Sequence, residues 1–228
     1  MLVSHKHRFI FVKTRKTGGT SVELALAPLC GPDDIITPLR EYDGAASEIT
    51  PRNFRLPENQ WSLRARARRL VGKPTPNRGT GFFQHMPAAD IRRLVGREIW
   101  DIYLTFTIER NPWDRQVSLY HWHYRNIASP PPFRSFILSP VRRKISRNWS
   151  MYTEADRLIV DHVIPYDELQ SGLAGIMAKI GIKDPPQLPR AKSGYRAKRD
   201  YRDYYDEETR LKVAGWYSAE IETFGFEF

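Results

Sequence analysis

The chain has 228 residues, of which 41% are hydrophobic, a single cysteine (Cys30) and a formal net charge of +10. This length and composition predict one folded domain over residues 1–228, exclude an internal disulfide and leave no apolar run long enough to span a bilayer. Because no apolar leader precedes the first expected strand, we expect a cytoplasmic protein. The positive charge favours anionic partners such as nucleotides, acidic glycans or anionic lipid.

The first expected unit is a strand, a basic loop and a helix, within the stretch RFIFVKTRKTGGTSVELAL at positions 8–26. The strand covers 9–12, and the helix starts near two adjacent glycines. Glycines let backbone N–H groups approach an anion, and a helix N-terminus supplies unpaired donors, so this loop is suited to a phosphate-like group. Lys16 adds a full charge. The loop is not a Walker A motif, because its lysine precedes the glycines.

Further helices and strands are expected from breaker residues and apolar periodicity along the rest of the chain. Up to position 95 these are a turn-rich stretch over 31–57, a helix over 61–72, a loop over 73–81, a short strand over 81–85 and a helix over 87–95. Beyond it are a buried strand over 100–108, a helix over 112–126 with Asn111 as N-cap, a strand over 161–164, a helix over 166–180 and a last helix over 206–224 ended by Gly225. This alternation predicts an α/β fold with a mainly parallel sheet, whose binding crevice lies at the carboxyl ends of the strands.

A second motif, TIERNPWDRQVSLY, occupies positions 107–120. It places Arg110 where a strand ends and Ser118 two turns into the following helix. An arginine fork and a hydroxyl can together bind a terminal phosphate. The alternative from these residues alone is that Arg110 pairs with a helix-end carboxylate such as Asp114.

The two motifs together resemble those of the PAPS-dependent sulfotransferases, where PAPS is 3′-phosphoadenosine 5′-phosphosulfate, and in particular the carbohydrate branch that includes the heparan 2-O-sulfotransferases. The family's P-K-T-[AG]-[GS]-T-S loop stands here as RKTGGTS from Arg15 to Ser21, with arginine in place of proline. The family's R-[DN]-P-x-[DE]-R-x-x-S-x-[YF] motif is matched in full from Arg110 to Tyr120. Weaker resemblance continues over 161–169, 188–193 and 216–226. It implies a P-loop-kinase-like fold with a central parallel sheet flanked by helices, and sulfuryl transfer from PAPS without a metal.

The resemblance also implies roles for individual residues. The first motif would bind the 5′-phosphosulfate, with Lys16 on the bridging oxygen, while Arg110 and Ser118 would hold the 3′-phosphate. The other donor-binding residues implied are Arg15, Thr17, Gly18, Gly19, Thr20 and Ser21 in the loop, and Lys192, Ser193 and Tyr195 in a segment that resembles the family's cofactor-covering loop.

His85 is the expected general base for the acceptor hydroxyl, since imidazole titrates near neutral pH and family members often place a histidine in a comparable position. The alternatives are that His85 caps the helix starting near Pro87, or that a carboxylate such as Glu48 is the base.

No metal site is expected, because His121 and His123, the only closely spaced histidines in the middle of the chain, would point apart on a helix.

These observations favour a sulfotransferase acting on a hydroxyl of a small-molecule, glycan or glycolipid acceptor. The alternatives are an ATP-dependent P-loop-like kinase and a non-catalytic protein that binds nucleotides or polyanions. The basic runs at 64–73 and 142–147 are open to three interpretations: solvated helix faces, recruitment of an anionic acceptor, or peripheral contact with a membrane surface. No recognisable nucleic-acid module accompanies the charge, so nucleic acid is not an expected partner. The sequence leaves the oligomeric state open.

Overall fold

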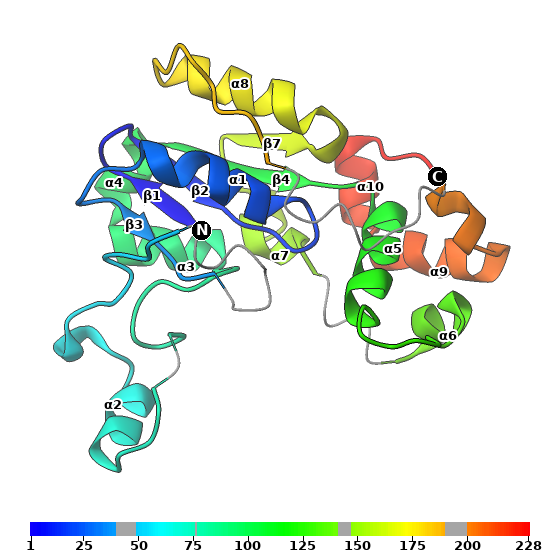
Figure 1. Cartoon of the computed structure of the whole chain (residues 1–228), viewed down its shortest axis with the longest axis horizontal. Helices are drawn as coiled ribbons and strands as arrows, with labels where there is room; N and C mark the ends of the chain where they lie inside the picture. Colours follow the sequence, from blue (N-terminus) through cyan, green and yellow to red (C-terminus); the bar gives the residue numbers. More distant parts are fainter. Residues whose placement is uncertain (40–48, 76, 141–146, 190–199) are drawn as a thin grey trace.

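The computed structural model describes residues 1–39, 49–75, 77–140, 147–189 and 200–228. Its centre is a five-stranded sheet in the order β3-β1-β2-β4-β7 (Figure 1). The strands of this sheet are β1 (Leu2–Ser4), β2 (Phe9–Val12), β3 (Ile35–Ile36), β4 (Leu104–Glu109) and β7 (His162–Pro165). A separate antiparallel pair consists of β5 (Thr153–Glu154) and β6 (Arg157–Leu158).

The sheet is mixed, and the predicted α/β class is confirmed. Strands β2, β4 and β7 run parallel, as expected. Strand β1, which the sequence analysis did not predict, pairs antiparallel with both β2 and β3. Only four residues, His5–Arg8, connect β1 to β2. Such a short connection can close a hairpin but cannot make the crossover that parallel strands need.

Helices cover both faces of the sheet (Figure 1). On one face α1 (Gly19–Leu26) and α8 (Leu169–Lys179) pack over Phe9 and Phe11. On the other face α3 (Ala88–Val95), α4 (Arg97–Ile102) and α7 (Trp149–Tyr152) pack near Ile10 and Val12. Because β2 is buried on both faces, its sequence is a continuous apolar run rather than an alternating one.

A third, strongly aromatic cluster lies beside the sheet, where α5 (Pro112–His123), α6 (Phe133–Leu138) and α9 (Glu207–Trp216) pack together next to α10 (Ser218–Phe224). Helix α2 (Leu63–Leu70) projects from the rest of the molecule in Figure 1. Short 3₁₀ helices complete the described elements: η1 (Ala27–Leu29), η4 (Glu58–Gln60), η6 (Tyr166–Glu168) and η7 (Tyr201–Tyr204). No helix within the described ranges is long and apolar enough to cross a membrane.

Most predicted elements are confirmed, with ends shifted by a few residues. Asn111 is the N-cap of α5, and its Oδ1 accepts a hydrogen bond from the Trp113 backbone at 3.1 Å. The predicted last helix is two helices, α9 and α10, separated at Tyr217, whose φ of −124° interrupts the helical path. Gly225, at φ 64°, ends α10 as predicted.

Two strand predictions need correction. Positions 100–102 of the predicted strand over 100–108 belong to α4, and only 104–109 form a strand. Trp100 reaches the core from the helix, so its apolar character does not mark a strand. The predicted strand over 81–85 is absent from the structure: Gly81 makes only isolated bridges, and His85 has φ 58°, outside the β region.

Candidate active site

The loop between β2 and α1 lies at the carboxyl end of β2, the edge where the crevice was expected. Lys16 has φ 62° and Gly18, the N-cap of α1, has φ 77°. A Cβ atom at Gly18 would lie 3.1 Å from the Tyr166 ring, and one at Gly19 would lie 2.8 Å from the Lys13 side chain. The two glycines therefore allow a left-handed turn and a close approach that larger residues would strain.

Buried side chains hold the loop between β2 and α1 against β4 and α1. Thr14 Oγ1 donates to the Ile108 carbonyl of β4 at 2.5 Å. Since that bond uses the only hydrogen of the Thr14 hydroxyl, Thr17 is the donor in the 2.8 Å contact between the two hydroxyls. Lys13 is buried and its ammonium pairs with Glu23 of α1 at 2.5 Å. The Thr17 hydroxyl and the Lys13 charge are thus engaged inside the protein, beneath the loop.

Asn148, which the sequence did not indicate as a site residue, holds the loop at Arg15. Its side chain is fully buried, accepts a hydrogen bond from the Arg15 backbone N–H at 3.0 Å and donates one to the Arg15 carbonyl at 3.0 Å. The two residues are 133 positions apart, and Asn148 belongs to no motif, so nothing in the sequence indicated this contact. This pair of hydrogen bonds, the Asn148 clamp, defines the path of the chain immediately before Lys16.

Arg110 brings the second motif to the same loop. It follows β4, and its Nη1 donates to the Lys16 carbonyl at 3.3 Å. Its guanidinium lies 4.1 Å from the centre of the Tyr166 ring, the ring that also contacts Gly18. The pairing with Asp114, which the sequence offered as the alternative to phosphate binding, is present as well, at 2.6 Å. That pair uses the Nε and Nη2 edge, so it orients the guanidinium while Nη1 faces the loop.

The second arginine of the motif, Arg115, lies in the core. Its side chain is 0% exposed, forms ion pairs with Glu109 and with Glu220, the latter at 3.3 Å, and stacks 4.6 Å from the Tyr217 ring centre. Tyr152 donates to the same Glu109 carboxylate at 2.7 Å. Although burial opposes the charge, the carboxylate of Glu109 raises the pKa of Arg115 above its ordinary value. Arg115 therefore stabilises the core rather than facing the site.

His85 lies against the back of the loop. Its Nδ1 is 3.1 Å from the Lys13 carbonyl. A carbonyl can only accept, so Nδ1 carries the hydrogen and Nε2 is left as an acceptor. Burial and the charges of Lys13 and Arg15 lower the pKa of His85 well below 6.5. The ring is thus neutral at pH 7, in the tautomer that can receive a proton at Nε2.

The alternative role for His85, capping the helix near Pro87, is not supported. Pro87 itself is the N-cap of α3, and no side chain of the described residues caps this helix.

Among the other predicted site residues, Thr20 is buried and Ser21 half-buried in the first turn of α1, and Ser118 is half-buried on α5. Glu48, Lys192, Ser193, Tyr195 and positions 142–146 of the second basic run lie outside the described residues, so their roles stay predictions.

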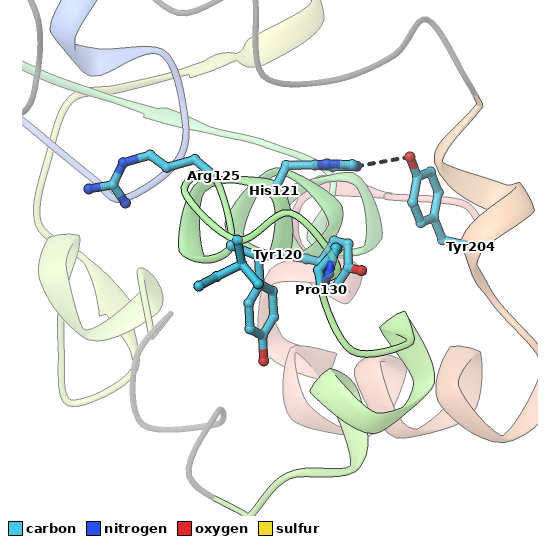
Figure 2. Close-up of a pocket in the computed structure, with 7 residues that line it drawn as sticks. Tyr120, His121, Arg125, Pro130 and Tyr204 are labelled. Atoms are coloured by element: carbon cyan, nitrogen blue, oxygen red, sulfur yellow. Dashed lines mark hydrogen bonds between the residues drawn. The ribbon is translucent and has the colours of Figure 1, made fainter.

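An aromatic pocket of about 400 Å³ adjoins the second half of α5. Figure 2 shows His121 pointing toward Tyr204, to which it is hydrogen-bonded at 2.8 Å, while Arg125 extends to the other side. Trp122 connects this region to the loop, because its ring is 4.7 Å from the Arg125 guanidinium and 5.3 Å from Lys16 Nζ. The pocket and its basic margin are therefore close to the phosphate-type loop.

Comparison with known proteins agrees with this arrangement at the level of the fold. The structure aligns with mouse sulfotransferase SULT7A1 complexed with PAP, with a TM-score of 0.52 and 13% identity, over 96% of this chain and 86% of that one. A sulfotransferase from Alicyclobacillus acidocaldarius also aligns, at a TM-score of 0.44 and 16% identity, over 97% of this chain and 96% of that one. The assignment of the fold rests on the alignment with the mouse structure. No protein-family model matches the sequence.

One curated protein is related by sequence. An Archaeoglobus fulgidus protein described as "Uncharacterized protein" is 36% identical over 107 residues, which cover 43% of this chain and 85% of the relative. Its name assigns no activity. The chain therefore has the sulfotransferase fold, with a P-loop-like parallel core, and belongs to the same family as this archaeal protein.

Proposed function

We propose that the protein transfers a sulfuryl group from PAPS to a hydroxyl of a carbohydrate or glycolipid acceptor. The observation that carries this proposal is the contact between Arg110 Nη1 and the Lys16 carbonyl, which joins the loop suited to a 5′-phosphosulfate to the arginine suited to a 3′-phosphate. The fold shared with the mouse sulfotransferase, whose structure contains PAP, supports the same donor.

The loop fits the phosphosulfate end of such a donor. The chain turns left-handed at Lys16 and Gly18, and the first turn of α1, which no side chain of the described residues caps, favours a dianion at this point. Lys16 would stabilise negative charge on the leaving oxygen, and Arg110 with Ser118 would bind the 3′-phosphate that distinguishes PAPS from ATP.

In the transfer, the bond between sulfur and the bridging oxygen breaks as a bond forms between sulfur and the acceptor oxygen. The hydroxyl proton passes to Nε2 of His85, and 3′-phosphoadenosine 5′-phosphate (PAP) leaves. His85 suits this role because its Nδ1 hydrogen is held by the Lys13 carbonyl, which leaves Nε2 as the acceptor of a proton.

The aromatic pocket on α5 is the part of the described surface that best fits the acceptor. Tyr124 and Tyr204 line it with half-buried rings of the kind on which sugar rings pack, and Arg125 provides a charge for an acidic substituent. Its link through Trp122 to Lys16 supports a position beside the reacting end of the loop.

The test is a thermal-shift titration with PAP, ADP and ATP. We expect stabilisation by PAP alone, of about 2.7 kcal/mol at a hundredfold excess over Kd, and its loss in Arg110→Ala. The matched control is Arg92→Ala, which also removes an arginine bound to one carboxylate at 2.7 Å but lies on α3. An equal response to ATP would indicate a kinase instead, and no response to any nucleotide would contradict the donor assignment.

The second test separates catalysis from binding. His85→Gln is expected to abolish turnover with PAPS while leaving the PAP shift intact. His7→Gln, which alters another half-buried histidine whose ring contacts a backbone carbonyl, is the control. Turnover that survives His85→Gln would remove His85 as the base.

A further inference from the structure

Helix α2 presents an apolar stripe to solvent. Leu63 is 80% exposed, Leu70 88% and Val71 66%. These positions, with exposed Ala67, are spaced i, i+4, i+7 and i+8, so they lie on one side of the helix. Scattered surface leucines are ordinary, but three large apolar side chains aligned on one face are not.

The orientation of this stripe is fixed by contacts on the opposite side. Ala65 is buried, and the Ser62 backbone N–H donates to the Gly79 carbonyl at 2.9 Å. Arg66, on the flank of the stripe, donates to the carbonyls of Trp61 and Asn59, at 3.1 and 2.6 Å, and so fixes the start of the helix. The burial of Ala65 and the bond between Ser62 and Gly79 hold α2 against its neighbouring loop, which leaves the leucines on the outer face of a helix that projects from the molecule (Figure 1).

Positive charge surrounds the stripe. The basic residues of the helix and its C-terminal turn are Arg64, Arg66, Arg68, Arg69 and Lys73. The helix carries no acidic residue in its first turn, and Arg69 pairs with Glu58 at 2.8 Å in an exposed ion pair. An outward apolar face between arginines matches an anionic bilayer surface, where apolar side chains enter the acyl boundary and arginines meet headgroups.

We propose that α2 binds the surface of an anionic lipid bilayer, with Leu63, Leu70 and Val71 inserted and the flanking arginines at the headgroups. The apolar residues favour lipid over a soluble polyanion, which would engage the arginines alone. The proposal is independent of the sulfotransferase assignment, because α2 supplies none of the candidate site residues.

The experiment is co-sedimentation of the full chain with phosphatidylcholine vesicles, with and without phosphatidylserine. We expect binding only when phosphatidylserine is present. Leu63→Ser with Leu70→Ser should weaken partitioning about a hundredfold or more, because both side chains lose their apolar burial. The matched control, Ile102→Ser with Leu211→Ser, changes residues that are 68% and 54% exposed on other helices and should bind like the wild type.

A charge arm tests the arginines. Arg64→Gln with Arg69→Gln should weaken partitioning by about tenfold or more, and added salt should do the same. Arg93→Gln with Arg97→Gln removes two exposed arginines from α3 and α4 and should have little effect.

Three outcomes would overturn the proposal. The first is no binding of the wild type to phosphatidylserine vesicles. The second is full binding by the double leucine variant, which would mean purely electrostatic attraction. The third is a wild-type dimer in vesicle-free solution that the leucine variant makes monomeric, since the stripe would then be covered by a second copy.

Discussion

Replacing Arg115 by methionine tests whether this arginine of the second motif stabilises the core, while Arg110 belongs to the candidate site. Arg115 is 0% exposed and pairs with Glu109 and Glu220, so Arg115→Met leaves two carboxylates buried without their cation. Breaking a buried ion pair in this way costs about 3–5 kcal/mol. For a chain of this size that corresponds to a fall in Tm of roughly 6–20 °C. Removal of an exposed pair, as in Arg92→Met, should cost less than about 1 kcal/mol.

The assay is thermal and urea unfolding followed by circular dichroism at several pH values. Burial raises the pKa of Glu220, and loss of the arginine that opposes this should raise it further, so the folded variant binds protons more tightly than its unfolded chain. Its stability deficit relative to wild type should therefore shrink as pH falls. Adding Glu220→Gln to Arg115→Met should recover part of the loss. A Tm within a few degrees of wild type, or a deficit that does not depend on pH, would refute the placement of Arg115 in a charged core network.

Three further predictions concern the loop and the thiol. In a pH–rate profile, kcat/KM should stay constant from neutral pH down past 6.5, because burial and the nearby cations lower the pKa of His85; a decline centred at or above 6.5 would contradict this. Asn148→Ala should cost about 1–3 kcal/mol in urea unfolding and weaken PAP binding in calorimetry; unchanged PAP affinity would show that the loop keeps its shape without the clamp. Burial raises the pKa of Cys30 to about 12, with Asp34 adding to the effect, so at pH 8 its alkylation should be about a thousandfold slower than in the urea-unfolded chain; similar rates would refute it.

The strand–loop–helix unit was predictable because its signals are local. Four consecutive apolar residues mark β2 as a strand buried on both faces. Gly18 marks a left-handed turn because its φ of 77° suits glycine, and Asn111 marks a helix start because its side chain caps the next turn. Each of these signals is read from residues that contact one another within the same turn or strand.

The failed strand predictions depend on tertiary contacts instead. An apolar, aromatic run such as that over 100–108 suits a strand or a buried helix equally well. Here α4 takes its first residues, with Trp100 buried in the core and Tyr103 as the C-cap. At 81–85 the phenylalanines belong to a loop that packs against the core. His85 in this loop has a positive φ and is hydrogen-bonded to the Lys13 carbonyl.

The candidate site was partly predictable for a geometric reason. Parallel strands present their carboxyl ends at one sheet edge, so the loop after β2 and Arg110 after β4 had to meet there. The roles of Asn148 and Trp122 were not predictable. Asn148 binds the backbone of Arg15, far away in the sequence, and Trp122 lies between Lys16 and Arg125, and neither contact produces a pattern in the sequence.

Both motifs share one arrangement, which a match of letters does not reveal. At or just before each motif a cation is buried and held by a carboxylate, Arg115 by Glu109 and Lys13 by Glu23. Lys16 and Arg110, which itself pairs with Asp114, meet at the sheet edge. The buried pair fixes the backbone that carries the edge cation, so less conformational entropy remains to be lost when an anion binds. Lys16 and Arg110, whose contact joins the two motifs at this edge, are therefore the cations that we propose for donor binding.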